Sequence, residues 1–437
     1  MNNALAHLSC LLFACLAPSI FAEVQVVKDS NAPPAIRKEL WVLSANWASE
    51  IPPQGAVNAP GQMEVLSPGD RISLALAADG ADREKLFEGR TLIVRIECGG
   101  TVSEDQGLKP IAIRRIKAQG ADMALWVLKA SGIGESDRAR LEQATSVVSL
   151  AVFRPSWTAP DVAQAQEVRI QVTVMGGATP EPTLEPVRIK LRPWTDWAND
   201  PATEQATLNG HFNQYRDNAT GGLLFSMLKG VTAAGSLRAP PVAEYFAISF
   251  KRNPAAAAAA LTQLPSFSPD MQYATLLVLR LGGTDITRQL QVLPPETQAL
   301  LRSIGPLEDP PKLLTFTDPV SVQAVRGIGN PMDQCWGAWM ASGDPVYLRE
   351  LVGLLDNAQD FPAFQAWTDA KGGAQGLNSR VARGLAYQIA GWSIGSFQRT
   401  DPHVADWLLF WQNDPAFPKS LRKEIESLLT NPAFRRQ

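Results

Sequence analysis

The period of the apolar residues changes near residue 194, and this change restricts the fold more than any other feature of the sequence. Before it, apolar and polar residues alternate, as in 168–174 and 187–192. Such alternation is typical of strands with one face on a core and one face in water. After it, apolar residues recur every three or four positions, as in 348–355, which is typical of helices. The sequence therefore predicts a strand-rich domain followed by a helical one.

The first part is expected to consist of short strands separated by turns. The predicted strands cover 40–44, 62–66, 71–77, 92–96, 110–117, 121–129, 146–153, 168–174 and 187–192. Turn signals such as Ser67-Pro68-Gly69-Asp70 lie between them. No long stretch with a helical pattern lies between them. Short strands without intervening long helices predict an antiparallel, Ig-like β-sandwich over 23–194.

The second part, 195–437, repeats a dipeptide of Asp or Asn followed by Pro. Asp or Asn accepts hydrogen bonds from the free N–H groups of a first helical turn, and Pro fits the first helical position. The dipeptides are Asn253-Pro254, Asp318-Pro319, Asn330-Pro331, Asp344-Pro345, Asp401-Pro402 and Asp414-Pro415. Each is expected to begin a helix, and 242–264, 332–356 and 385–412 are expected to be helical hairpins. Stacked hairpins predict a solenoid-like α-helical repeat array.

An apolar run from Ala4 to Ala17 precedes both parts. It is too short to span about 30 Å of hydrocarbon and is typical of a signal peptide. Residues 1–22 are therefore expected to be cleaved after Ala22, which predicts a periplasmic or secreted protein. Because no Lys or Arg precedes the run, a buried N-terminal helix is an alternative, and Cys15 provides a second alternative, a lipid anchor. No later apolar segment is long enough to predict a transmembrane span.

The composition excludes several classes of protein. The chain has 40 Lys and Arg residues against 43 Asp and Glu residues, and its formal net charge is −3. Nucleic-acid binding needs a basic excess or a dense basic face, so no nucleic-acid partner is expected. Once the signal peptide is removed, Cys98 and Cys335 are expected to be buried free thiols, because they lie in different predicted domains. No metal-ligand or cofactor-binding spacing occurs, so neither a metal nor a cofactor is expected.

The segment from Asp333 to Pro345 carries a family resemblance. It reads Asp-Gln-Cys-Trp-Gly-Ala-Trp-Met-Ala-Ser-Gly-Asp-Pro and resembles a segment of uncharacterised exported bacterial proteins, approximately Asp-x-x-Trp-Gly-Ala-Phe-Phe-Ala-Thr-Gly-Asp. Ala390–Ile394, followed by Pro402-His403-Val404, is similar to a later part of those proteins, although the His-Pro order is reversed here. The resemblance covers about 240–415 and implies a helical array after a signal peptide. It implies no known activity, so it carries over no catalytic residue.

One segment matches a catalytic pattern. Gly391–Gly395 reads G-x-S-x-G, in which a nucleophilic serine needs a sharp strand-to-helix turn and a later acid and histidine. Asp401 and His403 follow in that order, which makes Ser393, Asp401 and His403 the candidate catalytic residues. However, the residues before Ser393 have a helical pattern, and no parallel sheet is expected here. We therefore expect no catalytic residue.

Other residues are candidates for binding. A basic set is expected on a solvated sheet face, or in a patch for an acidic glycan or protein if its strands are neighbours. It comprises Arg114, Arg115, Lys117, Arg169, Arg188, Lys190 and Arg192. The pairs Trp336 with Trp339 and Trp407 with Trp411 have helical spacing, so they are expected in the core, with an aromatic glycan platform as the alternative.

The expected function follows from these observations. Helical arrays offer extended binding surfaces, and the sequence shows no convergent set of catalytic groups. We therefore expect an exported non-enzymatic protein that binds another envelope macromolecule, a protein or a glycan, through its helical array or a sandwich face. The alternative is a cell-envelope hydrolase that acts on a glycan or an ester through Ser393 or a carboxylate pair.

Overall fold

The structure is a computed structural model. It describes residues 36–45, 56–57, 63–79, 84–118, 146–176, 184–198, 220–238, 240–313, 315–373 and 376–434. The predicted signal peptide and the predicted strand 121–129 lie outside these residues. Two compact units are formed, and each is described by itself. The sheet unit comprises the described residues up to Val231 together with Ala258–Gln263, and the helical unit comprises Thr232–Ala257 and the described residues from Leu264 onward.

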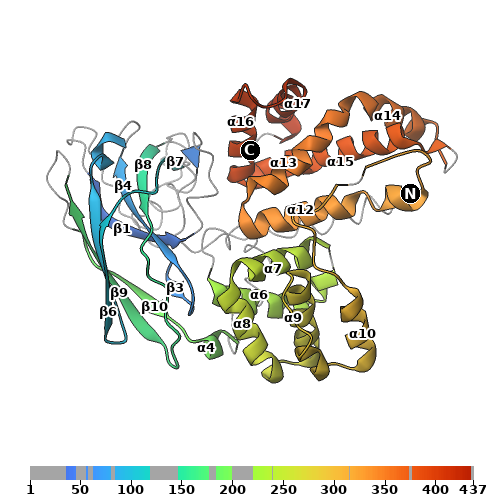
Figure 1. Cartoon of the computed structure of the whole chain (residues 1–437). Coiled ribbons are helices and arrows are strands. Elements are labelled where there is room, and N and C mark those ends of the chain that lie inside the picture. Colours follow the sequence, from blue (N-terminus) through green and yellow to red (C-terminus); the bar gives the residue numbers. More distant parts are fainter. Residues whose placement is uncertain are drawn as a thin grey trace, which may run out of the picture. The chain divides into compact units, whose positions relative to one another are not determined.

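The sheet unit contains two five-stranded sheets (Figure 1). The strand order is β1-β4-β8-β7-β2 in one and β3-β10-β9-β5-β6 in the other. The strands are β1 (Ile36–Ser44), β2 (Ala56–Val57), β3 (Val65–Leu66), β4 (Ile72–Asp79), β5 (Thr91–Cys98), β6 (Thr101–Leu108), β7 (Ala112–Ala118), β8 (Ser146–Phe153), β9 (Gln166–Met175) and β10 (Val187–Leu191). A short 3₁₀ helix, η2 (Glu84–Phe87), precedes β5.

The sheets are mixed, whereas the sequence predicted antiparallel ones. The longer strands pair antiparallel, but the two-residue edge strands pair parallel, β2 with β7 and β3 with β10. Alternation of apolar residues reports which face of a strand is buried and carries no information on strand direction. A two-residue strand is also too short to show alternation, so the parallel pairs had no sequence signal.

One hydrophobic cluster takes its side chains from both sheets. In β9, four alternate side chains are buried, and the polar residues between them are exposed or half-buried. The cluster includes Val168, Ile170, Val172 and Val174 of β9, Val94 and Ile96 of β5, Leu74 and Leu76 of β4, and Ala151 and Phe153 of β8. The alternation predicted for this part of the chain therefore does select the residues of the core.

Strand β6 was absent from the predicted strands. It pairs with β5 at the edge of its sheet, and its residues are exposed or half-buried. An edge strand with water on both faces needs no apolar alternation, so the period gave no signal. The turn before it did give one, because Gly99 and Gly100 have φ of 57° and 80° and join Cys98 to Thr101 as a two-residue hairpin.

Helix α6 (Gly221–Ala233) begins against the turn Ser67–Asp70 of the sheet unit. The carboxylate of Asp70 accepts from the N–H of Gly221 at 2.9 Å, and the hydroxyl of Ser67 accepts from the N–H of Gly222 at 2.7 Å. A Cβ atom at Gly222 would lie 2.2 Å from the ring of Trp197. The first turn of α6 therefore belongs to the sheet unit. The sequence predicted a domain boundary at residue 194, and that boundary remains a prediction.

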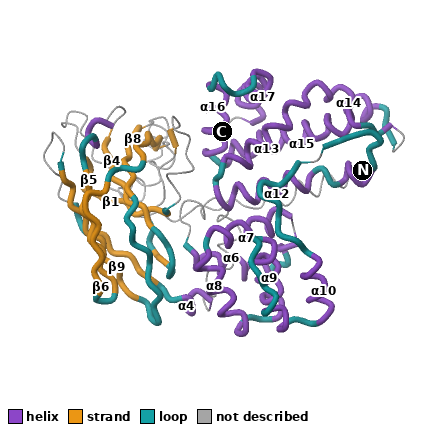
Figure 2. The backbone as a smooth tube through the Cα atoms, in the orientation of Figure 1, coloured by secondary structure: helices purple, strands orange, loops and turns teal. Residues whose placement is uncertain are grey.

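Helices make up most of the rest of the chain (Figure 2). They are α4 (Trp194–Ala198), α7 (Pro240–Arg252), α8 (Pro254–Gln263), α9 (Pro269–Leu281), α10 (Pro295–Ser303), α11 (Val322–Arg326), α12 (Gly329–Ser342), α13 (Pro345–Gly353), α14 (Phe361–Asp369), α15 (Ser379–Thr400), α16 (Pro402–Asn413) and α17 (Lys419–Thr430). Within the described residues, no helix has the length and apolar character needed to cross a membrane.

Three of the predicted helix starts are confirmed. The side chains of Asn253, Asp344 and Asp401 accept from the N–H groups of Ala256, Val346 and His403, and proline takes the first helical position each time. The other three are wrong. Asn330-Pro331 lies within the first turn of α12, Ser321 caps the helix after Asp318, and Asp414 closes a turn before α17. The dipeptide permits a helix to start, but the residues after it form a helix only where they can pack against other parts of the protein.

The predicted helical core is confirmed at the tryptophans. Trp336, Trp339, Trp407 and Trp411 are at most 9% exposed. Trp336 stacks on Phe397 with ring centroids 3.9 Å apart, and Trp407 lies 5.5 Å from Trp411. Cys98 and Cys335 are both buried and free, as predicted.

Candidate functional site

Helices α14 and α15 of the helical unit pack closely beside the end of the 3₁₀ helix η6 (Leu354–Asp360). At Gly384 of α15, a Cβ atom would lie 2.4 Å from the carbonyl oxygen of Asp360 and 2.9 Å from the Cβ of Phe364. Only glycine permits this approach, because no other residue lacks the Cβ atom. The approach brings the side chain of Asp360 within reach of arginines on α15.

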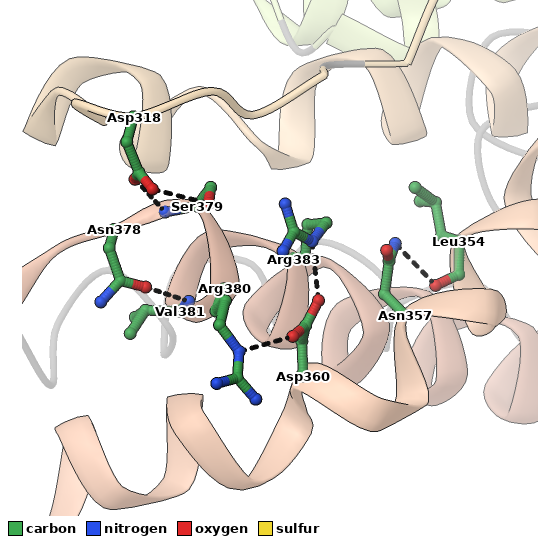
Figure 3. A network of polar contacts seen from close by, with 9 residues as sticks. All are labelled: Asp318, Leu354, Asn357, Asp360, Asn378, Ser379, Arg380, Val381 and Arg383. Carbon is green, nitrogen blue, oxygen red and sulfur yellow. Dashed lines mark hydrogen bonds and ion pairs between the residues drawn. The ribbon is translucent and has the colours of Figure 1, made fainter.

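The carboxylate of Asp360 binds two of these arginines (Figure 3). Its Oδ1 accepts from Nε of Arg380 at 3.0 Å, and its Oδ2 accepts from Nε of Arg383 at 2.7 Å. The Asp360 side chain is only 6% exposed, whereas those of Arg380 and Arg383 are 64% and 33% exposed. Burial alone would raise the pKa of Asp360, but the hydrogen bonds and charges of the arginines outweigh it and hold this pKa below its ordinary value.

Each arginine keeps unused donors. Only Nε of Arg380 and of Arg383 binds Asp360, and the terminal nitrogens have no partner among the residues that the structure describes. A guanidinium is a rigid planar fork, so fixing its Nε also sets the direction of its other donors. One negative and two positive charges leave a net charge of +1. Carboxylate, sulfate and phosphate groups accept paired donors of this kind, so the arrangement can bind an oxyanion.

Three further hydrogen bonds, to Asp318 and Asn378, set the start of α15, which carries the arginines (Figure 3). The carboxylate of Asp318 accepts from the N–H and the hydroxyl of Ser379, at 2.6 and 3.1 Å. The side-chain oxygen of Asn378 accepts from the N–H of Val381 at 3.0 Å. These bonds occupy donors of the first turn and fix where the helix begins. Asp318, predicted to start its own helix, thus stabilises the start of another.

Helix α14 carries a row of three aromatic side chains, Phe361, Phe364 and Trp367. The ring centroids of neighbouring members lie 6.3 Å apart. No residue of α14 is buried, and the three rings are half-buried. The indole Nε1 of Trp367 donates to the carbonyl oxygen of Gly373 at 3.3 Å, which fixes the orientation of the ring. Flat apolar surface of fixed orientation therefore lies on the helix that follows Asp360.

The predicted catalytic candidates have structural contacts. Ser393 lies within the continuous helix α15, and its hydroxyl donates to the carbonyl oxygen of Ala390 at 3.0 Å. Asp401 is 1% exposed, and its carboxylate accepts from the N–H of His403 and from Nε1 of Trp339, both at 2.9 Å. The structure thus brings Asp401 and His403 together in a helix cap. It gives Ser393 no strand-to-helix turn, which the nucleophile elbow needs.

The predicted basic set is divided between the two sheets. Arg114, Arg115 and Lys117 lie on β7, whereas Arg169, Arg188 and Lys190 lie on β9 and β10 of the other sheet. Arg188 pairs with Glu167 at 2.9 Å, and Arg169 lies 3.8 Å from Glu97. The guanidinium of Arg192 lies 4.3 Å from the ring centroid of Trp197. The seven residues therefore do not share one face, and acidic neighbours offset part of the charge on β9 and β10.

A pair of acids, the buried Glu244 of α7 and the half-buried Asp333 of α12, lies where these two helices pack together. Glu244 is 6% exposed, and its Oε2 has no hydrogen-bond partner among the described residues. Burial and the charge of Asp333 raise the pKa of Glu244 to about 7, and burial raises that of Asp333 to about 6. Raised pKa values of this kind occur at functional sites and also at acids that are simply buried in the interior.

The arginine pair and Asp360 were missed in the sequence. The signal available was the spacing of Arg380 and Arg383, which are three positions apart and would share a face if this segment were helical. Their common partner lies about twenty residues earlier, and its burial depends on tertiary packing.

No group of His, Cys, Asp and Glu within the described residues could hold a metal ion. Comparison with protein-family models, curated proteins and solved structures gave no match.

Proposed function

We propose that the chain is an exported, non-enzymatic protein that binds an acidic macromolecule of the cell envelope through its helical part. The observation that carries this proposal is the arginine pair, Arg380 and Arg383, held at Nε by the buried Asp360. Arginine side chains that are already held by a hydrogen bond lose little conformational freedom when a ligand binds. A partner with negative charge is favoured, because its charge complements theirs. An acidic glycan and an acidic protein both meet this requirement.

The finer architecture belongs to the same proposal. A β-sandwich over 23–194 is supported by the hydrophobic cluster that takes side chains from both sheets. A solenoid-like array over 195–437 is supported by three helix pairs, α7 with α8, α12 with α13 and α15 with α16, each joined at a capped Asn-Pro or Asp-Pro. The resemblance of Asp333–Pro345 to exported bacterial proteins agrees with such an array.

Export is proposed from the sequence of residues 1–22, which predicts cleavage after Ala22. The mature chain should then begin at Glu23 in a periplasmic or secreted fraction. Mass spectrometry of the fractionated protein tests this: an intact Met1 in the cytoplasm contradicts export. An acylated Cys15 supports the lipid-anchored form instead.

The binding proposal predicts that the chain co-sediments with isolated cell envelopes. The bound fraction should fall as salt rises, because exposed charges are screened. The double variant Arg380→Gln/Arg383→Gln should lose most of the binding. A matched control is Arg302→Gln/Arg326→Gln, which removes the same charge from two exposed arginines of α10 and α11. If the first double variant binds as well as the wild type, the proposed function is wrong.

The hydrolase alternative keeps one supporting observation, the acid pair Glu244 and Asp333. A carboxylic acid with a pKa near 7 is suited to general acid catalysis at neutral pH. Release of reducing ends from envelope glycan by the wild type, abolished in both Glu244→Gln and Asp333→Asn, would support this function over binding alone. Unchanged release in both variants would remove the pair from consideration.

A further inference from the structure

The aromatic row of α14 directly follows Asp360, the residue that holds the arginine pair. A Cβ atom at Gly384 of α15 would meet both the backbone carbonyl of Asp360 and the Cβ of Phe364, so the chain at Asp360 and the base of the Phe364 side chain pack on α15 one position after Arg383. Phe364 and Trp367 follow Asp360 by four and seven positions, which is the spacing of one helix face. Charge and flat apolar surface are therefore combined in one region of the helical unit.

The ring of Trp367 is held before any ligand arrives. A Cβ atom at Gly372 would lie 2.2 Å from Cδ1 of the indole and close to Nε1 and Cε2 as well, so the backbone of that turn packs over one face of the five-membered ring and leaves the opposite face for a ligand. The hydrogen bond from Nε1 to the carbonyl oxygen of Gly373 holds the ring at its edge. The indole is nevertheless half-exposed. Because both the ring and the arginines are fixed, a ligand that uses them loses little additional freedom on binding.

The two features together restrict the chemistry of the ligand. A carboxylate or sulfate group accepts paired donors from guanidinium groups. A pyranose ring presents C–H groups that pack on the electron-rich face of an aromatic ring. An acidic peptide would satisfy the arginines but would make no comparable use of a row of flat rings. A saccharide that carries an acidic group uses both features.

We propose that Arg380, Arg383, Phe364 and Trp367 form a binding site for an acidic saccharide. The acidic group binds the terminal nitrogens of the arginines, and the sugar rings pack on the aromatic row. Asp360 is a positioning residue, which orients the arginines and does not contact the ligand. The inference rests on the proposed binding function and adds to it the class of the partner.

The test measures binding of the purified full chain to four polymers by calorimetry. The polymers are polygalacturonate, dextran sulfate, uncharged dextran and poly-L-glutamate. The wild type should bind at least one of the two acidic polysaccharides about tenfold more tightly than poly-L-glutamate, and it should not bind dextran. The variant Arg380→Gln/Arg383→Gln should lose about tenfold or more for the acidic polysaccharides, since two charge-assisted contacts are removed.

Variants of the aromatic row separate the saccharide from other acidic partners. Phe364→Leu and Trp367→Leu keep an apolar side chain but remove the flat ring, and each should weaken binding of the acidic polysaccharide by about three- to tenfold. Their binding to poly-L-glutamate should not change. Val322→Leu, at an exposed apolar residue of α11, is the control.

Two outcomes overturn the inference in different ways. If poly-L-glutamate binds as tightly as the polysaccharides and the aromatic variants bind like the wild type, the saccharide class is wrong, but the arginine pair still supports the proposed function. If the wild type binds no acidic polymer and the arginine variant still co-sediments with envelopes, both the inference and the proposed function are wrong.

Discussion

Two buried carboxylates, Asp360 and Glu244, show how neighbours decide the behaviour of a single residue. Asp360 is buried against two guanidinium groups, and its pKa is lowered. Glu244 is buried to a similar extent but has Asp333 as its charged neighbour, and one of its oxygens has no partner within the described chain. The first carboxylate holds a site in place, whereas the second is a source of instability when it is ionised.

Glu244 predicts that the protein gains stability as the pH falls from 8 to 5.5. Its pKa in the folded protein, about 7, lies above the ordinary value of 4.5, so the folded state binds the proton more tightly than the unfolded state. The penalty is complete above pH 7 and decreases as the pH falls below it. Asp333, with a pKa of about 6, acts in the same direction.

The variant Glu244→Gln removes this charge and keeps the shape of the side chain. At pH 8 it should stabilise the fold by about 1–3 kcal/mol, the cost of an unsatisfied buried polar group. At pH 5.5 the difference should be smaller. Thermal unfolding of both proteins at the two pH values measures it, and the comparison cancels the titration of the groups that the two proteins share. An equal difference at both values would contradict the prediction.

At the scale of helices, the side chain of Asp344 caps the start of α13. Its carboxylate accepts from the N–H of Val346 at 3.0 Å, as the sequence predicted. Asp344→Asn should leave the melting temperature almost unchanged, because Asn caps nearly as well. Asp344→Ala should cost about 0.5–2 kcal/mol. Equal melting temperatures for wild type and both variants would refute the cap.

The contact between α7 and α12 depends on Gly337. A Cβ atom there would lie 2.3 Å from the carbonyl oxygen of Pro241 and 3.2 Å from the Cβ of Glu244. Gly337→Ala should therefore destabilise the fold by about 1–3 kcal/mol, because backbone atoms must move apart. Gly353→Ala is the control, since a Cβ atom there would meet nothing within 4 Å. It should be neutral or stabilising by up to about 1 kcal/mol. Chemical denaturation measures both, and equal effects would contradict the argument.

At the scale of the molecule, the hydrogen bonds of Ser67 and Asp70 to α6 decide where the sheet unit ends. A fragment of 23–194 is predicted from the sequence to fold with a strand-rich spectrum. A fragment of 23–233 should be more stable, because it keeps α6 over Trp197 and satisfies the buried Ser67 and Asp70. Circular dichroism and thermal unfolding of both fragments test this. Equal stability would place the boundary at residue 194 after all.

The sequence by itself determined the buried faces of the longer strands and the starts of three helices. Alternation selected Val168, Ile170, Val172 and Val174, and side-chain caps selected the starts of α8, α13 and α16. These features are local, because a period or a cap depends on residues within a few positions of one another. Strand β6 shows the limit, since a solvated edge leaves no apolar period and only its glycine turn gave a signal.

Only the tertiary structure decided which side chains meet. Asp360 binds arginines 20 and 23 positions later, Asp318 binds Ser379 across 61 positions, and Asp70 caps a helix 151 positions away. The basic residues that looked alike in the sequence lie on two different sheets. Residues so far apart in the sequence meet only because helices and strands pack together, and no local sequence pattern encodes that packing. The charge and shape of a binding site depend on this packing, so the sequence alone did not reveal them.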